Sequence, residues 1–273
     1  MDRRLTPATP RIAHSSMKGR IEVPVFTDGT PMHVAQPVVD LLRAPNGARE
    51  RQLLLGEAFT VIDRNEGHAF GFAGKDGYCG WLPDAALSRG PTPTHWVATP
   101  GTHLYPEPRV QAPEVCALPL GAQVAITADH GKWLETTQGF IPAPHLRPLG
   151  DWRTDAVSVA ESLLGTPYLW GGNSRGGIDC SGLAQLSYWA CGIAIPGDSD
   201  LQEGAGQEVP ADAPLQRGDL IFWKGHVALI VDAARLIHAN GHTMSVAYEP
   251  VQACIDRIIA QEGRPVTHRR RLL

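Results

Sequence analysis

The first half of the chain consists of short runs in which apolar and polar residues alternate. Between residues 38 and 148, these runs are separated by Gly, Pro and Asn. Alternation with a period of two is typical of strands with one buried face, and the turn residues predict tight connections. Residues 55–62 have a pattern similar to residues 120–126, and residues 77–83 to residues 139–142. The first half therefore contains a diverged repeat of a small β module.

We expect each copy of the repeat to form a small β-barrel. The first barrel is predicted over residues 35–90 and the second over residues 91–149, with a Pro-rich linker at residues 89–93. Residues 1–34 are rich in proline and have no clear periodicity. We expect them to form an arm on the protein surface.

The pattern changes in the second half, residues 150–273. Residues 154–165 predict a helix with Thr154 as its N-cap, and a second helix is expected from about Cys180 to Ala190. Apolar runs after these helices predict strands at residues 219–223, 226–231, 235–239 and 244–248. Helices followed by antiparallel strands are typical of an α+β domain.

The composition indicates a folded protein with no strong electrostatic preference for a partner. Hydrophobic residues make up 43% of the chain and charged residues 19%, which is ordinary for a globular protein. The net charge of -4 gives no reason to expect nucleic acid or an anionic membrane as a partner. The basic run at residues 268–271 is too short to change this, and we expect it to be a solvated tail.

The cysteines and the start of the chain bear on cofactors and location. Five cysteines are scattered without a C-x-x-C pair, which argues against a disulfide framework or a structural zinc site. The charged first residues precede no apolar stretch, and no apolar run approaches membrane-spanning length. We therefore expect no metal, no cofactor, no membrane and a cytoplasmic location; the oligomeric state is left open.

Cys180 is the candidate nucleophile. It follows a glycine-rich, aromatic segment at residues 166–179 and begins the second predicted helix. At a helix N-terminus, the backbone N–H groups and the helix dipole favour a thiolate over a thiol. His226 and His238 each lie in a strand-like apolar run. A thiol, a base and an orienting group are the components of a cysteine nucleophile, so the chain is predicted to be a cysteine hydrolase.

The second half resembles the NlpC-type cell-wall peptidases, which are papain-like cysteine enzymes that cut the γ-D-glutamyl–diamino acid bond of bacterial stem peptides. Five segments in the family's order carry this resemblance: GTPYLWGG at residues 165–172, DCSGL at 179–183, RGDL at 217–220, GHVA at 225–228 and IHA at 237–239. Residues 38–148 resemble bacterial SH3-like domains. The resemblance implies a papain-like domain, with its helices packed on an antiparallel sheet, preceded by two small SH3-like barrels.

Two SH3-like domains ahead of such a catalytic domain resemble the dipeptidyl-peptidase VI-like branch of the family. That branch trims free L-Ala-γ-D-Glu-diamino acid peptides, and its first SH3-like domain closes the cleft and recognises the free amino terminus. The resemblance implies hydrolysis of the γ-D-glutamyl–L-diamino acid bond, with diaminopimelate or Lys, in small murein peptides with an N-terminal L-Ala. Cell-wall peptide recycling is the expected role.

The resemblance also gives the catalytic residues their roles. Cys180 attacks the scissile carbonyl, and His226 takes the thiol proton and returns a proton to the leaving amine. His238 occupies the place that papain-like enzymes give to Asn and would fix the tautomer of His226, with His242 as the alternative. Tyr168 is placed near the oxyanion, and the Cys180 backbone N–H would share that charge.

Several residues are expected to contact the substrate. In the second half, Asp179 would hold the substrate ammonium and Ser181 would hydrogen-bond the γ-D-Glu portion. Ser199 and Trp170 are also assigned to the substrate site.

In the first β module, Tyr78 and Glu50 form the expected amine-binding pair, and Glu57 is the alternative to Glu50. Two other functions are left open for the chain. One is an exported or phage-type peptidoglycan endopeptidase whose SH3-like domains bind the wall. The other is a thiol acyltransferase or amidase on the same scaffold, because a fold does not determine a reaction.

Overall fold

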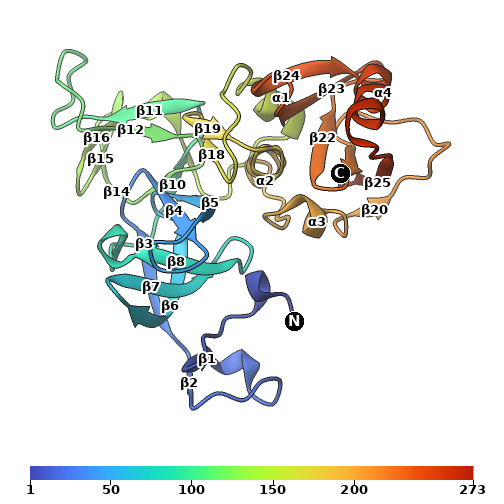
Figure 1. Cartoon of the computed structure of the whole chain (residues 1–273). Coiled ribbons are helices and arrows are strands. Elements are labelled where there is room, and N and C mark those ends of the chain that lie inside the picture. The colour runs from blue at the N-terminus through green and yellow to red at the C-terminus, as the bar shows by residue number, and fades with distance from the viewer. Residues whose placement is uncertain (273) are drawn as a thin grey trace. The chain divides into compact units, whose positions relative to one another are not determined.

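The computed structural model describes residues 1–272 and divides into two compact units, Met1–Asp151 and Trp152–Leu273 (Figure 1). The first unit is built from short strands and 3-10 turns, and the α-helices of the described residues lie in the second unit. None of the helices within residues 1–272 is both long and apolar enough to cross a membrane.

The first unit begins with an arm that has its own short elements. Two strands of the arm pair in parallel, with Ile12 opposite Val25. The elements of the arm are η1 (Arg3–Leu5), β1 (Ile12–His14), η2 (Ser15–Met17) and β2 (Val25–Thr27).

A seven-stranded antiparallel sheet forms the first β module, with the strand order β5-β4-β8-β7-β6-β3-β9. The alternation seen in the sequence is present in β4, where Val39 and Leu41 are buried and their neighbours are half-buried. Its elements are β3 (Thr30–Val34), β4 (Val38–Leu42), β5 (Arg49–Leu54), β6 (Ala58–Asn65), β7 (His68–Ala73), β8 (Cys79–Pro83), η3 (Asp84–Ala86) and β9 (Leu87–Ser88).

The predicted end of the arm at residue 34 is wrong, because residues 30–34 form β3 and belong to the first module. β3 pairs with β6 through Met32 opposite Phe59, and Val34 lies in the module's core. Pro31 conceals this strand in the sequence, since proline is disfavoured within a sheet.

The second β module consists of three small antiparallel sheets, β13-β10-β17, β11-β12 and β14-β15-β16. Its core contains Val97, Leu118 and Ile141, together with Leu55 from the first module. Its elements are β10 (His95–Val97), β11 (Gly101–Leu104), β12 (Cys116–Pro119), β13 (Gln123–Val124), β14 (Ile126–Asp129), β15 (Trp133–Thr136), β16 (Gly139–Pro142), η4 (Ala143–His145) and β17 (Leu146–Pro148).

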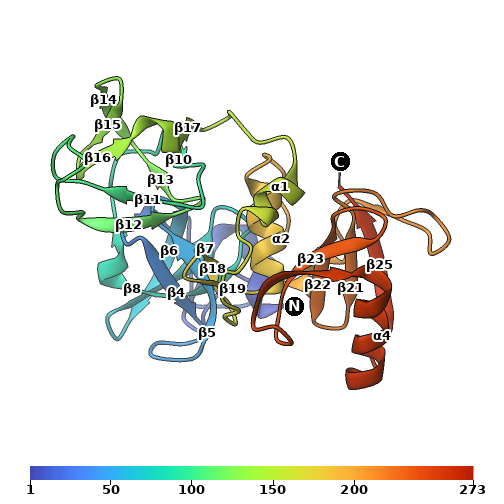
Figure 2. The same cartoon turned by 90° about the horizontal axis from the view of Figure 1, so that it is seen from above.

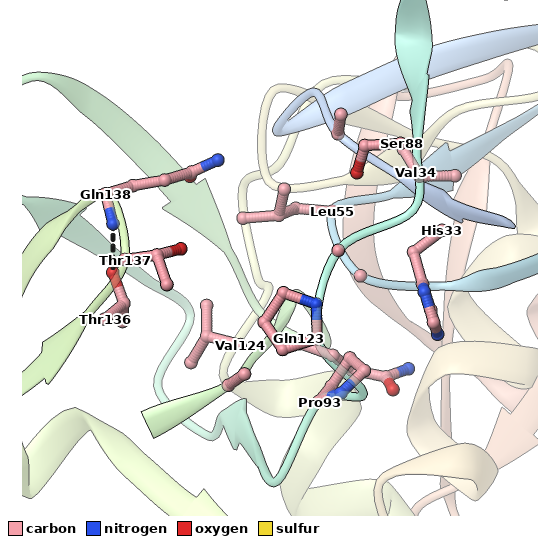
Figure 3. A pocket seen from close by; sticks show the side chains of 15 residues that line it. His33, Val34, Leu55, Ser88, Pro93, Gln123, Val124, Thr136, Thr137 and Gln138 are labelled. Carbon is pink, nitrogen blue, oxygen red and sulfur yellow. Dashed lines mark hydrogen bonds between the residues drawn. The ribbon is translucent and has the colours of Figure 1, made fainter. Parts of the chain in front are cut away.

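The two β modules are joined backbone to backbone. The N–H of Gln123 donates to the carbonyl of Leu55 at 2.7 Å. Gly56 has a φ of +78°, and a Cβ at this position would lie 2.2 Å from the Gln123 carbonyl oxygen. Figure 3 shows the small pocket beside this junction, of about 70 Å³, lined by residues of both modules. Glycine at position 56 therefore permits the close approach of the modules.

The second unit is an α+β domain, as predicted. Its six-stranded antiparallel sheet has the order β20-β25-β21-β22-β23-β24, and α2 packs against β22 and β23 (Figure 2). The elements are α1 (Ala156–Glu161), β18 (Asn173–Ser174), β19 (Gly177–Ile178), α2 (Cys180–Trp189), α3 (Ser199–Gln202), β20 (Gln207–Glu208), β21 (Leu220–Trp223), β22 (His226–Ile230), β23 (Arg235–Asn240), β24 (Ser245–Pro250), α4 (Val251–Glu262) and β25 (Val266–Arg271).

Two local predictions in this unit are wrong. The N-cap of α1 is Asp155 rather than Thr154, because the Asp155 carboxylate accepts the N–H of Val157 at 3.0 Å. The basic run at residues 268–271 is not a solvated tail but part of β25, in the interior of the sheet order. Arg271 donates two hydrogen bonds of 2.7 Å to Asp219, whose side chain is 1% exposed. Pairing with a buried carboxylate holds this basic strand in the sheet.

The first β module contains a buried ion pair whose loss should destabilise the protein. Arg51 Nη1 lies 2.9 Å from Asp76 Oδ2, with both side chains 6% exposed, and the guanidinium lies over the Tyr78 ring. Because Asp76→Ala removes the carboxylate that faces a buried guanidinium, we expect the free energy of unfolding to fall by about 3–5 kcal/mol. Urea denaturation measures this change.

The matched control is Glu107→Ala, which removes the exposed partner of Arg109. An exposed ion pair contributes less than about 1 kcal/mol, so this variant should unfold almost as the unmodified protein does. Equal losses in the two variants would contradict the role of the buried pair.

Candidate active site

A glycine-rich loop leads the chain to the first turn of α2. The short strands β18 and β19 pair with Asn173 opposite Ile178, and the N–H of Asp179 donates to the Gly172 carbonyl at 3.2 Å. A Cβ on Gly182 would lie 2.6 Å from that same carbonyl oxygen. The loop backbone therefore rests directly on the helix, which requires glycine at position 182.

Asp179 is the N-cap of α2. Its Oδ1 accepts the Gly182 N–H at 2.7 Å and the Ser181 hydroxyl at 3.0 Å, while Oδ2 accepts the Gly171 N–H at 2.8 Å. These bonds satisfy orphan donors at the helix start and fix Cys180 as the first helical residue. Asp179 is half-buried, so its assignment to the substrate ammonium stays a prediction beside this structural role.

The Cys180 thiol lies against the start of β22. The backbone N–H groups of Val227, Ser181 and Cys180 itself favour the thiolate. Burial outweighs them, with the charge of Asp179 adding to its effect, and raises the pKa of Cys180 to about 12. The N–H groups at the helix start therefore favour the thiolate in the predicted direction, but in the resting site the thiol is the favoured form. The thiol is 7% exposed, and desolvation of the charge dominates.

The two predicted histidines meet on neighbouring strands. His226 Nε2 lies 2.8 Å from His238 Nδ1, and His238 is 1% exposed. Burial lowers the pKa of His226 to about 3 and also lowers that of His238. His242, the alternative orienting residue, lies exposed in the turn between β23 and β24. The structure thus brings His238 into contact with His226, and both imidazoles are neutral at pH 7; the orienting role of His238 stays a prediction.

Sequence reasoning missed Glu249 behind the histidines. Its Oε2 lies 3.2 Å from His238 Nε2, and Arg257 of α4 donates to both of its carboxylate oxygens at 2.8 and 2.7 Å. The available signal was a single acidic residue ending an alternating strand, followed eight positions later by an arginine. That spacing predicts an ion pair between Glu249 and Arg257 only when it is known that α4 packs against β24.

A pocket of about 530 Å³ adjoins the base. Tyr168, Trp170 and His226 line it, together with residues from α4 and from the turn after β23. Burial, with the charges of Cys180 and Asp179, raises the pKa of Tyr168, so its hydroxyl keeps its proton and can donate. Trp170 is 66% exposed at the pocket. Three predicted site residues therefore share one cavity.

Ser199 is the first residue of α3 and is half-buried. Three residues later Gln202 is fully buried, and its amide donates to the carbonyls of Ser181 at 3.0 Å and Pro196 at 2.9 Å. Gln202 therefore holds α3 to the first turn of α2, a support that sequence reasoning missed. It places Ser199 on the segment next to that turn.

The amine-binding residues predicted in the first β module already have partners there. Glu50 forms a two-point ion pair with Arg3 of the arm. Tyr78 is 2% exposed. Glu57, the alternative, is buried and paired with Lys75. The Glu57 side chain is thus paired inside the module. The Glu50 side chain is instead bound by a cation from another segment, the Arg3 guanidinium of the arm.

A thiol, an imidazole and an orienting imidazole in this arrangement can perform acyl transfer through a thioester. In such a reaction the thiol would supply the nucleophile and His226 the proton acceptor, and the Tyr168 hydroxyl and the Cys180 N–H would donate to an oxyanion. No step of this chemistry requires a metal or a cofactor.

Comparison with known proteins supports this assignment. Residues 165–258 match the NlpC/P60 family, and residues 41–87 match the bacterial dipeptidyl-peptidase SH3 domain. The chain is 30% identical over 242 residues to the gamma-D-glutamyl-L-lysine dipeptidyl-peptidase of Bacillus cereus, covering 74% of this chain and 70% of the relative. It is 42% identical over 90 residues to dipeptidyl-peptidase 6 of Lysinibacillus sphaericus, covering 33% of each protein.

The fold has a counterpart among solved structures. A crystal structure of an NlpC/P60 family protein from Bacillus cereus matches with a TM-score of 0.76 and 22% identity, covering 89% of this chain and all of the other. The papain-like fold with an SH3-like domain, predicted from the sequence, is thereby confirmed. The chain belongs to the NlpC/P60 family of cysteine peptidases and has an SH3-like domain ahead of its peptidase domain.

Proposed function

We propose that this protein hydrolyses the γ-D-glutamyl–L-diamino acid bond of free murein peptides with an N-terminal L-Ala, in cell-wall peptide recycling. The observation that carries the proposal is that the Cys180 thiol lies against the backbone N–H of Val227, the residue after His226, while His226 Nε2 lies 2.8 Å from His238 Nδ1. The dipeptidyl-peptidase relative supports the specificity, since its 242-residue match is longer than the second unit and so extends into the first.

The reaction follows from the residues in place. As the substrate's γ-carbonyl carbon approaches, the Cys180 proton moves to His226 and the sulfur forms the new bond. The resulting oxyanion accepts hydrogen bonds from the Tyr168 hydroxyl and the Cys180 N–H. His226 then gives its proton to the departing amine, the C–N bond breaks, and a thioester remains. Water, deprotonated by His226, hydrolyses that thioester and restores the thiol.

The pocket beside His226 fits the leaving group. The departing amine must lie next to the group that protonates it, so the diamino acid belongs on the His226 side of the site. Tyr168 and Trp170 provide walls for the aliphatic part of that residue, and Arg264 with Glu262 provides one charge of each sign. A diamino acid carries both carboxylate and ammonium groups, which match this pair.

The free amino terminus is the second element of the proposed specificity. We assign its ammonium to Asp179 of the second unit, and we keep the Tyr78–Glu50 pair as the amine-binding pair that the sequence predicts in the first β module. Glu50 already binds the guanidinium of Arg3, which shows that its carboxylate is accessible to a cation from outside its own sheet. A substrate ammonium would take the place of Arg3 or share the carboxylate with it.

Replacing the nucleophile or the base should abolish hydrolysis. Cys180→Ala and His226→Ala should each lower kcat by at least about 10³-fold, because nucleophile and base act in the same step and the loss of either one stops that step. Release of L-Ala-D-Glu from L-Ala-γ-D-Glu-diaminopimelate, followed by mass spectrometry, measures the rate. The control variant Cys191→Ala, just after the other end of α2, should retain activity. An inactive Cys191→Ala protein together with an active Cys180→Ala protein would show that Cys180 is not the nucleophile.

The pH dependence follows from the burial of His226. A general base must be unprotonated, and burial lowers the pKa of His226 from its ordinary 6.5 to about 3. The base therefore stays available as the pH falls from 7 to 5, and we expect kcat/KM to remain nearly constant over that interval. A half-maximal value near pH 6.5 would show that the imidazole titrates as if exposed.

Acetylating the substrate amine should separate an exopeptidase from a wall-cutting endopeptidase. The acetyl group removes the positive charge and leaves buried carboxylates without their partner, so kcat/KM should fall on the order of a hundredfold. Glu50→Gln should reduce this discrimination, whereas Asp84→Asn, at an exposed ion pair of the same module, should preserve it. Equal cleavage of free and acetylated peptides, or digestion of intact sacculi, would favour the endopeptidase.

A further inference from the structure

Glu249 lies on the same side of the sheet as His238. In the register of β23 and β24, His238 is opposite Ala247, and Leu236 is opposite Glu249. Residues two apart on a strand share a face, so Glu249 points the same way as Ala247 and His238. The diagonal separation of such a pair is within reach of a long side chain, as the 3.2 Å distance between Glu249 Oε2 and His238 Nε2 shows.

We propose that Glu249 is a positioning residue that selects the proton-bearing nitrogen of His238 and, through it, the proton-accepting nitrogen of His226. The catalytic sequence would then run from Glu249 through His238 and His226 to Cys180. The role rests on the proposed peptidase reaction, but the tautomers it predicts are properties of the resting protein.

The carboxylate of Glu249 can only accept. Arg257 donates to both of its oxygens and, with the contact to His238, holds the pKa of Glu249 far below its ordinary range. An ionised carboxylate has no proton to donate. The nitrogen of His238 that faces Glu249 must therefore carry the proton. That nitrogen, Nε2, is buried and makes no well-aligned hydrogen bond within residues 1–272, so its 3.2 Å contact with the Glu249 carboxylate is the polar interaction open to it.

The proton on Nε2 determines the rest of the chain of contacts. His238 is neutral, because burial lowers its pKa even though Glu249 acts in the opposite direction, and a neutral imidazole carries one ring proton. Nδ1 of His238 is then an acceptor. His226 Nε2, 2.8 Å away, must donate to it, which leaves the lone pair of neutral His226 on Nδ1. Nδ1 is therefore the atom that receives the Cys180 proton.

Glu249 also compensates the charge that forms during the reaction. When His226 Nδ1 takes the thiol proton, the ring becomes an imidazolium whose Nε2–H still donates to His238. The groups facing Glu249 are His238 from β23 and Arg257 and Cys254 from α4. Burial and the charge of Glu249 raise the pKa of Cys254 to about 12, so this thiol adds no charge. The carboxylate, shared with Arg257, is thus the anion behind the two rings.

The same cluster has the composition of a metal site but not its electrostatics. Ligand atoms of His238, Glu249 and Cys254 lie within 4.8 Å of one another. Arg257 already uses both carboxylate oxygens, and the Cys254 thiol keeps its proton, whereas a metal needs the thiolate. The Arg257 guanidinium therefore occupies the carboxylate oxygens that a metal ion would need. This favours a positioning role for Glu249 over a metal-binding role.

The test is Glu249→Gln, because glutamine keeps the size of the side chain and can present a donor to His238. Arg257 attracts the amide oxygen, so the amide NH2 faces Nε2 and disfavours its proton. We expect kcat to fall at least about tenfold with KM nearly unchanged. Nitrogen–proton correlation spectra of the ring should show His238 protonated on Nε2 in the unmodified protein and on Nδ1 in the variant.

Asp232→Asn is the matched control. Asp232 also receives two N–H groups from an arginine, Arg235, but it is exposed in the turn before β23. This variant should leave kcat and both tautomers unchanged. A folded Glu249→Gln protein with unchanged kcat and tautomers would overturn the proposal, as would an Nδ1 proton on His238 in the unmodified protein.

The spectra of the unmodified protein keep the proposal testable if Glu249→Gln does not fold. They also separate it from the proposed function, since they need no substrate. A protein that fails to cleave murein peptides yet shows His238 protonated on Nε2 would contradict the function and support the role of Glu249.

Discussion

The capping of α2 by Asp179 is the interaction on which the peptidase unit depends. One carboxylate accepts two backbone N–H groups and a hydroxyl from both sides of Cys180. These bonds tie the glycine-rich loop to the first helical turn, and the absence of a Cβ at Gly182 allows the loop to lie on the helix. The contacts of Asp179 and of the loop backbone therefore fix the position of Cys180, and no histidine takes part in them.

Burial of the nucleophile and base explains why the site needs so many fixed dipoles. Desolvation keeps both the Cys180 thiol and the His226 ring neutral at rest. Charge separation must then occur during the reaction, at two buried groups. The N–H groups around the sulfur and the contact between the two histidines are in place beforehand, so they can stabilise the developing charges without reorganisation. Burial also strengthens each of these interactions.

The parts of the site that could be predicted from the sequence are those encoded locally. The α2 start at Cys180 and the strands that bear His226 and His238 follow from glycine, cap and apolar patterns within a few residues. Glu249 could not be found in this way, because its importance comes from its diagonal position across β23 and from Arg257 on a helix that was not predicted. The direction of the Cys180 pKa shift could not be predicted from the sequence either, since burial raises this pKa and burial depends on the whole fold.

The wrong prediction for residues 268–271 has a related cause. Four consecutive basic residues are ordinarily solvated, and only tertiary partners make them a strand. Asp219, buried at the start of β21, requires a cation, and Arg271 provides it while β25 pairs with β21. Sequence pattern alone contains neither the burial of Asp219 nor the return of the chain after α4.

The C-terminal segment packs directly against the strands that carry the two histidines. A carboxylate cannot be kept ionised in a half-buried position beside His238 without a nearby positive charge. Arg257 supplies that charge from α4, and Cys254 and Ile258 of the same helix pack against Ala228 and Leu236 of the histidine-bearing strands. The apolar contacts of α4 therefore place the guanidinium of Arg257 beside Glu249, the guanidinium keeps that carboxylate ionised, and the carboxylate lies 3.2 Å from His238.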